Sequence, residues 1–241
     1  MAGEQFIPFL IFLVAFAAIA WFVYQHEKKR AAEFAALAES LGLHFEKRPG
    51  HEILDQVGFL DAMPRGNSRR AKFLLHGTYR DLDVRIFQYT YQTGSGKNQQ
   101  THSHTVAWAR VPATWPGLTI VPEHVGHKLF DALGGDDIDF ESDEFSRRFW
   151  VRCGDRKFAY DVIHGRTMEH IMAPGWQRWE LKGPFLTLWE NRGRLRVPEV
   201  RPALDRLAAF WELLPSFRRP GGIQGGPPAT GAPTFAAVTG R

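Results

Sequence analysis

Two histidines have the spacing of metal ligands. His102 and His104 fall in a segment of alternating apolar and polar residues, and side chains two apart on a strand project from the same face. Neutral imidazoles suit Zn²⁺, which takes three protein ligands at a catalytic site and four at a structural one. His124, His127 and several carboxylates are possible further donors. One hypothesis is therefore a metal-dependent enzyme or hydrolase, and the alternative is a polar strand face beside a loop.

The segment before these histidines is rich in glycine and carries a lysine. Residues 93–100 read Thr-Gly-Ser-Gly-Lys-Asn-Gln-Gln. A phosphate-binding P-loop is excluded, because Tyr91 stands where its first glycine belongs and Asn98 where its Ser or Thr belongs. We expect a hairpin tip, where the backbone N–H groups of Gly94 and Gly96 with the Lys97 ammonium can form a small anion-binding nest.

The remaining candidates lack a complete catalytic pattern. Residues 136–144 hold six carboxylates but not the glycine of a calcium-binding EF-hand loop. They predict a charged edge strand, and a docking face or a divalent-ion site is the alternative. Neither zinc-protease motif is present around His164 and His170. Cys153, the single cysteine, predicts a reducing compartment. We expect a protein that is not an enzyme, with no cofactor and no catalytic residue.

Adjacent pairs of strands predict an antiparallel α+β domain rather than a doubly wound fold. The expected strands are 73–79, 82–92, 102–111, 118–121, 138–141, 145–152, 176–181 and 185–190. We expect Arg80-Asp81 and Gly183-Pro184 to turn two hairpins, and Pro112, Pro116 and Pro122 to separate elements. The expected helices are 123–133, 158–163, 167–172 and 198–214.

The first part of the chain predicts a membrane anchor. Residues 6–24 are 19 residues without a charge, and about 20 helical residues cross the hydrocarbon layer. Trp21 and Tyr24 stand at the far end, where aromatic side chains favour the interface. Residues 25–42 continue as a helical stalk that ends at Gly42. A cleaved signal peptide, cut after Ala20, is the alternative, although no Lys or Arg precedes the apolar run.

The distribution of charge predicts the orientation of the anchor. Lys28, Lys29 and Arg30 follow the span, so the positive-inside rule places the N-terminus outside and the body in the cytoplasm of a plasma or inner membrane. Residues 31–216 hold 24 basic and 24 acidic side chains, which argues against a nucleic-acid-binding domain. Residues 217–241 are rich in Gly and Pro, contain three arginines and no acid, and predict a disordered tail.

Several strings of the body resemble a family of uncharacterised bacterial proteins with an N-terminal membrane helix, common in actinobacteria. The similarity spans roughly residues 35–215 and rests on residues 38–43, 85–91, 101–106, 121–123, 140–145 and 155–160. The resemblance implies a membrane anchor and carries no catalytic residue.

The sequence therefore predicts four parts: an N-terminal tip and transmembrane helix (1–24), a stalk (25–42), a cytoplasmic α+β domain (43–216) and a tail (217–241). The leading hypothesis is a membrane-anchored binding protein with a protein partner. The alternatives are a membrane-associated enzyme that uses His102 and His104, and a domain that contacts lipid peripherally through its basic residues.

Overall fold

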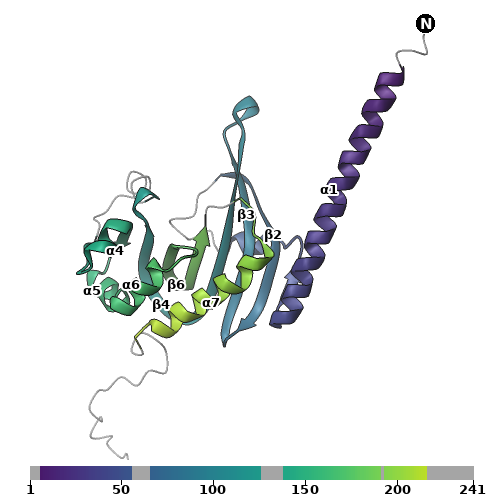
Figure 1. Ribbon diagram of the computed structural model, residues 1–241. Coiled ribbons are helices and arrows are strands. Elements are labelled where there is room, and N and C mark those ends of the chain that lie inside the picture. Colours follow the sequence, from purple (N-terminus) through teal and green to yellow (C-terminus); the bar gives the residue numbers. More distant parts are fainter. Residues whose placement is uncertain (1–5, 56–65, 126–137, 191–192, 216–241) are drawn as a thin grey trace, which may run out of the picture.

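A computed structural model describes residues 6–55, 66–125, 138–190 and 193–215 (Figure 1). Its helices are α1 (Phe6–Leu41), α2 (Glu52–Asp55), η1 (Gly96–Asn98), α4 (Asp143–Arg148), α5 (Arg156–Val162), α6 (Gly165–Met172) and α7 (Val197–Leu213). Its strands are β1 (His44–Glu46), β2 (Asn67–Tyr79), β3 (Leu82–Thr93), β4 (Gln100–Pro122), β5 (Phe149–Cys153) and β6 (Arg178–Glu190). The antiparallel sheet with several helices confirms the α+β prediction.

The apolar segment and the stalk form one helix, α1, of 36 residues. Every side chain from Phe9 to His26 is exposed, and among the described residues α1 is the one helix long and apolar enough to span a membrane. Lower down, Phe34 and Ala38 are buried against the sheet. Gly42 ends the helix with a φ of +68°, and the Leu43 N–H donates to the Ala38 carbonyl at 2.8 Å.

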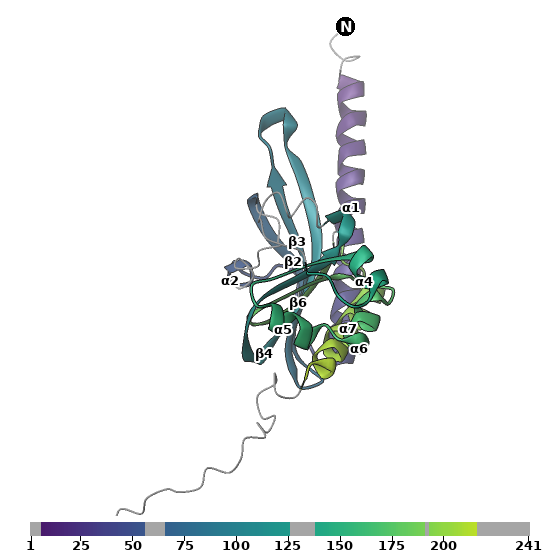
Figure 2. The ribbon, with the colours of Figure 1, turned by 90° about the vertical axis from the view of Figure 1, so that its left-hand side faces the viewer.

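The first three strands form an antiparallel meander (Figure 2). β2 and β3 meet at Arg80 and Asp81, whose φ values of +47° and +63° suit the tight turns that match strand twist. β3 then pairs with β4 along its whole length, from Asp83 opposite Arg110 to Thr93 opposite Gln100. The prediction of this hairpin is confirmed, and β2 begins six residues earlier than expected.

β4 is one strand of 23 residues, so the prediction that prolines divide it is wrong. Its first part pairs with β3 up to Arg110, and its last part pairs with β5 from Leu118. Pro112 and Pro116 lie between these two partners, where the strand changes neighbour. A missing N–H costs little at such a position, which explains how the strand accommodates both prolines.

The expected hairpin of residues 176–181 and 185–190 is instead one bent strand, β6. Both halves of β6 pair with β4. Gly183, at φ +54°, lies opposite Trp115 between two shifts of register. Both strands bend there. As a result Arg178 and Glu190, at the two ends of β6, form an ion pair of 3.0 Å. The expected turn is present, but β4 binds both arms instead of leaving them to pair with each other.

The described part of the acidic segment, residues 138–144, is not an edge strand, and the expected strand 145–152 is half helix. Ile138 and Phe140 are buried in irregular backbone, and Ser142 caps α4 by accepting the Phe145 N–H. Asp143 and Glu144 occupy the first turn of α4, where carboxylates favour the positive end of the helix dipole. Local capping therefore outweighs the alternation of apolar residues.

The other predicted helices of the body are confirmed as α5, α6 and α7 within two residues at each end. β1 and α2 are short elements that the sequence does not predict. Glu123–Val125 are helical, while the rest of the expected helix 123–133 and the tail from 217 lie outside the described residues.

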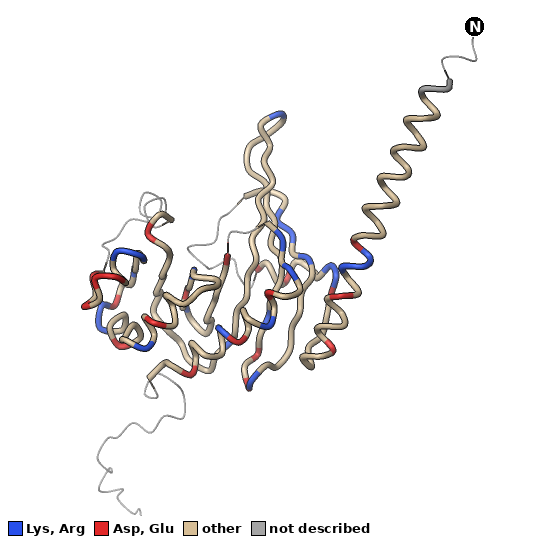
Figure 3. Tube along the Cα trace, viewed as in Figure 1, with Lys and Arg blue, Asp and Glu red and all other residues tan. Residues whose placement is uncertain are grey.

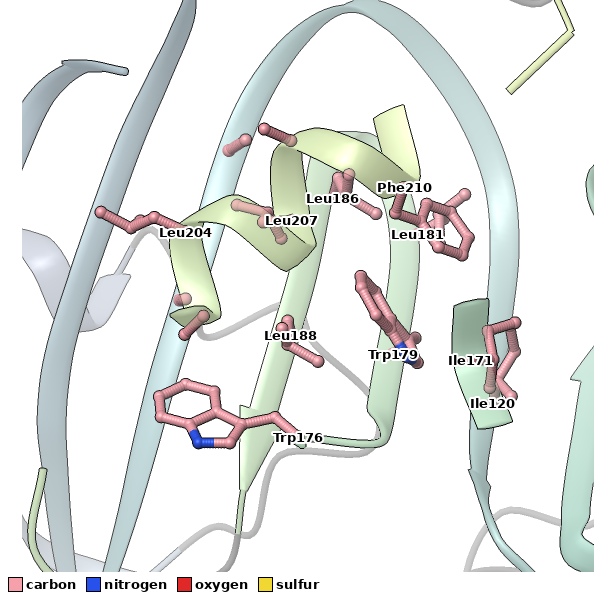
Figure 4. Close-up of a cluster of buried hydrophobic side chains, with 14 of the residues drawn as sticks. Ile120, Ile171, Trp176, Trp179, Leu181, Leu186, Leu188, Leu204, Leu207 and Phe210 are labelled. Atoms are coloured by element: carbon pink, nitrogen blue, oxygen red, sulfur yellow. The ribbon is translucent and has the colours of Figure 1, made fainter. Parts of the chain in front are cut away.

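The larger hydrophobic core lies between the sheet and the helices α1, α5, α6 and α7. Figure 4 shows α7 inside the bend of β4 and β6, with Leu204, Leu207 and Phe210 directed at the strands. The rings of Trp179 and Phe210 stack at 4.5 Å. A smaller cluster on the other face of the sheet joins Phe87, Tyr89, Tyr91, Val106, Trp108 and Trp189 to α2.

Replacing Phe34 tests whether α1 belongs to the core. We expect Phe34→Ala to lower the free energy of unfolding by about 3–5 kcal/mol, because a buried phenyl ring leaves a cavity. Urea unfolding of the full chain in detergent micelles measures the change. Phe22→Ala on the same helix is the control, since Phe22 is 71% exposed. Equal loss in the two variants would contradict the docking of α1.

Candidate functional site

A cavity lies where α1 meets the body. It has a volume of about 660 Å³ and opens between α1 and the chain that leads into α7. Its lining residues are His26, Lys29, Arg30, Glu33, Gly193, Arg194, Leu195, Arg196, Val197 and Pro198. Four of them are basic and one is acidic, so the cavity carries net positive charge. We call it the basic cleft.

Arg30 lines the basic cleft and joins α1 to the body. Its guanidinium donates to the Leu195 carbonyl at 2.6 Å and to Gln88 Oε1 at 3.0 Å, and it lies 4.2 Å from the centre of the Phe73 ring. Burial, together with the positive charge of Arg194, lowers the pKa of Arg30. The sequence groups Arg30 with Lys28 and Lys29 as a membrane flank, whereas the structure gives it a docking role.

The other predicted membrane-flanking residues remain exposed. Trp21 and Tyr24 lie on α1 with ring centres 6.4 Å apart, and Lys28 and Lys29 follow one turn below. Figure 3 shows no charged residue on the upper half of α1 and a group of basic residues where it meets the body. The flank therefore has the order expected at an interface: apolar span, aromatic residues, basic residues.

The predicted nest residues lie at the tip of the β3–β4 hairpin. Gly94 and Gly96 have φ values of +75° and +58°, and a Cβ on Gly94 would come within 2.4 Å of the Asn98 carbonyl oxygen. Lys97 is exposed in η1. In both ribbon views the tip extends in the same direction as the apolar half of α1 (Figures 1 and 2). The tip thus lies on the same side of the body as the apolar half of α1.

His102 and His104 share a face of β4, as predicted, and both stack on the ring of Tyr91. His102 Nε2 lies 2.7 Å from the Thr93 hydroxyl, and His104 is 2% exposed with Nε2 3.5 Å from the Tyr91 hydroxyl. Burial, then the charges of Arg178 and His102, lowers the pKa of His104 to about 4. This histidine is therefore neutral at physiological pH.

Within the described ranges, no three His, Cys, Asp or Glu side chains come together as metal ligands. His164 Nε2 lies 3.1 Å from the Leu213 carbonyl, and His170 Nε2 lies 3.0 Å from the Arg206 carbonyl. Both imidazoles contact the backbone of α7 from α6. Cys153 is half buried, and burial raises the pKa of its thiol. The zinc hypothesis for His102 and His104 stays a prediction.

A second basic cavity, of about 380 Å³, lies beside α2. Its charged lining consists of Arg48, Arg69, Arg70 and Lys72, with His51 beside them. No sequence motif singles out these residues. The available signal was the basic pair Arg69-Arg70, but the contact with residues 48–54 depends on the fold.

No sequence motif marks the basic cleft either. Arg194 and Arg196 alternate in a short basic run, which is a weak signal. Their approach to Lys29 and Arg30 joins segments more than 160 residues apart. Such a contact arises from the packing of α7 and α1 on the same sheet.

No family model matches this chain, and no curated protein does. Among solved structures, the chain is similar to the crystal structure of the mycobacterial trehalose monomycolate transport factor A, TtfA, with 13% sequence identity and a TM-score of 0.48. The match covers 77% of this chain and 96% of that one. The resemblance to an uncharacterised bacterial family stays a prediction.

Arg30 and Lys29 offer a matched pair for testing the docking contact. We expect Arg30→Ala to lower the free energy of unfolding by about 2–3 kcal/mol, because it removes two hydrogen bonds from a charged group and a cation–π contact. Lys29→Ala, at the preceding position, should change the free energy of unfolding by less than about 0.5 kcal/mol. Urea unfolding of both full-length variants in micelles measures the difference, and similar losses would refute the docking role.

His104 should make stability depend on pH in the acid range. An unfolded histidine titrates near ~6.5, so a folded pKa of about 4 means that the unfolded state binds the proton more readily. The stabilisation is complete above about pH 6.5 and is lost toward pH 4, with roughly 2 kcal/mol lost by pH 5. Urea unfolding at pH 7 and pH 5 should show a smaller loss in His104→Phe than in the wild type. The same loss in both proteins would show that His104 does not contribute.

Proposed function

We propose that this chain is a single-pass membrane protein that holds a binding domain against the membrane surface. The N-terminus lies outside, residues 6–24 span the bilayer, and the body 43–216 lies in the cytoplasm with the tail 217–241 beyond it. Residues 25–42 connect the span to the body. The domain acts as a membrane-anchored interaction protein with a protein partner.

The single observation that carries this proposal is the continuity of α1. The side chains of the helix are exposed from Phe9 to His26, and Phe34 and Ala38 are buried in the core. The helix is continuous between these two parts. A flexible linker would let the domain rotate freely, whereas this helix fixes which surface faces the bilayer. The basic cleft and the β3–β4 tip lie on that surface.

The orientation rests on charge and redox chemistry. Lys28 and Lys29 are exposed directly after the span, as the positive-inside rule requires for a cytoplasmic side. A lone cysteine fits a reducing compartment. The enzyme alternative at His102 and His104 needs a third ligand, and zinc analysis of the purified chain is its direct test.

The anchor can be distinguished from a signal peptide by the mass of the mature protein. We expect the chain purified from membranes to retain residues 1–20 and to resist extraction at alkaline pH, because α1 is anchored by the span. Intact-mass spectrometry and carbonate extraction measure both properties. A chain that begins at Trp21 and is released in soluble form would overturn the anchor.

Cysteine labelling tests the orientation in intact cells. In a Cys153→Ser background, we expect a membrane-impermeant maleimide to label Gly3→Cys before lysis and Lys157→Cys only after lysis, since Lys157 is exposed on the body. Labelling of Lys157→Cys in intact cells would reverse the proposed topology.

A further inference from the structure

We propose that the basic cleft binds the phosphate of an anionic phospholipid in the leaflet next to the body. This inference rests on the proposed membrane anchor. It adds a site and a ligand class: a lipid headgroup held between α1 and residues 193–198, with its acyl chains along the apolar surface of α1.

Two basic side chains in the basic cleft have no carboxylate partner among the described residues. Arg30 is engaged by Leu195 and Gln88, and Arg196 pairs with Glu199 at the start of α7. Lys29 and Arg194 are exposed, and neither has an ion pair with any described carboxylate. These two side chains approach from different segments and line the same cavity. They are available for an anion in a way that Arg30 and Arg196 are not.

The depth of Lys29 along α1 matches the depth of the lipid phosphates. Lys29 follows Tyr24 by five residues, or about 7.5 Å along the helix axis. The polar layer on each side of the hydrocarbon core is roughly 5–8 Å thick. Lys29 therefore lies at the level of the lipid phosphates when Tyr24 lies at the hydrocarbon boundary. Glu33, the acid of the cleft, lies one turn farther from the membrane and leaves the membrane end of the cleft positive.

The N-terminal end of α7 adds a favourable electrostatic contribution at the basic cleft. Val197 and Pro198 form the first turn of this 17-residue helix and line the cleft. Its positive dipole end reinforces the attraction that Lys29 and Arg194 exert on an anion. Glu199 points its carboxylate back to Arg196, so part of its charge is already neutralised.

Continuity with the span favours a lipid over a soluble anion or an acidic protein. The cleft includes His26, and the α1 surface above it is exposed and apolar as far as Phe9. A phospholipid can satisfy both surfaces at once, with its phosphate in the cleft and its chains against α1. A free phosphate uses only the lower part, and an acidic peptide leaves the apolar part to other lipids.

The experiment is native mass spectrometry of the full chain in dodecyl maltoside, with phosphatidylglycerol or phosphatidylcholine added at equal concentration. We expect the phosphatidylglycerol adduct to dominate by about tenfold, the size expected of one or two basic residues near an anionic lipid. In the double variant Lys29→Gln with Arg194→Gln, the ratio should fall close to one. The control Arg156→Gln with Lys157→Gln removes the same charge from the exposed start of α5 and should keep the preference.

The outcomes separate the ligand sources. Equal adducts of the two lipids in the wild type, or equal loss in the control variant, would overturn the cleft. Displacement of phosphatidylglycerol by an equimolar amount of inorganic phosphate would identify a soluble anion as the ligand and overturn the lipid assignment. Matched urea unfolding of all variants establishes that they are folded. Alkaline extraction of the same variants tests the anchor separately, since it depends on residues 6–24 and not on the cleft.

Discussion

The position of the body relative to α1 depends on the contact between α1 and a bulge in β2. The register of β2 against β3 shifts between Lys72 and Leu75, and Phe73 adopts a φ of +54° there. The shift moves Phe73 to the α1 side of the sheet, whereas Ala71 lies on the other side. Its ring contacts Phe34 at 5.2 Å and receives the Arg30 guanidinium at 4.2 Å. A strained residue in the sheet, Phe73, thus provides the surface on which α1 packs.

The same contact explains why Arg30 differs from its neighbours in sequence. The side chains of Lys28 and Lys29 are exposed, while Arg30 gives up part of its hydration to reach Leu195 and Gln88. A planar guanidinium can stack on Phe73 and donate to two acceptors together, which a lysine cannot do. The backbone at Leu195 is thereby tied to α1, and this tie forms the wall of the basic cleft.

Local patterns in the sequence predict the elements, and long-range packing decides how they combine. The long apolar helix, the β2–β3 turn and the helices α5, α6 and α7 follow from apolar periodicity and turn chemistry, and each lies where the sequence predicts it. The sequence does not predict the bend of β4 and β6, because prolines and a Gly-Pro pair end strands in most contexts. Here β4 continues through its prolines and changes its partner strand there. Ile138 and Phe140 alternate like a strand, but the Ser142 cap directs the chain into α4.

In the candidate site, too, local patterns predict some features and long-range packing decides the others. His102 and His104 share a face because the period of a strand requires it, and the nest residues occupy a hairpin tip because glycine allows the turn. The basic cleft needs Lys29 and Arg194 to meet across the fold, and no local pattern contains that information. The role of Arg30 was hidden for the same reason, since three adjacent basic residues look equivalent until one of them is buried.

The composition of the β3–β4 tip agrees with a body held at a polar interface. Residues 93–100 contain no apolar side chain, and the backbone N–H groups of such a tip would lose their water inside hydrocarbon. Among phosphates and water the same groups remain solvated, and Lys97 gains attractive charges. In the proposed arrangement, a tip that extends toward the bilayer yet cannot enter it limits how far the body can tilt about α1. The Arg30 contact with Leu195 and Gln88 acts in the same direction, so the proposed arrangement keeps the mouth of the basic cleft in the headgroup layer.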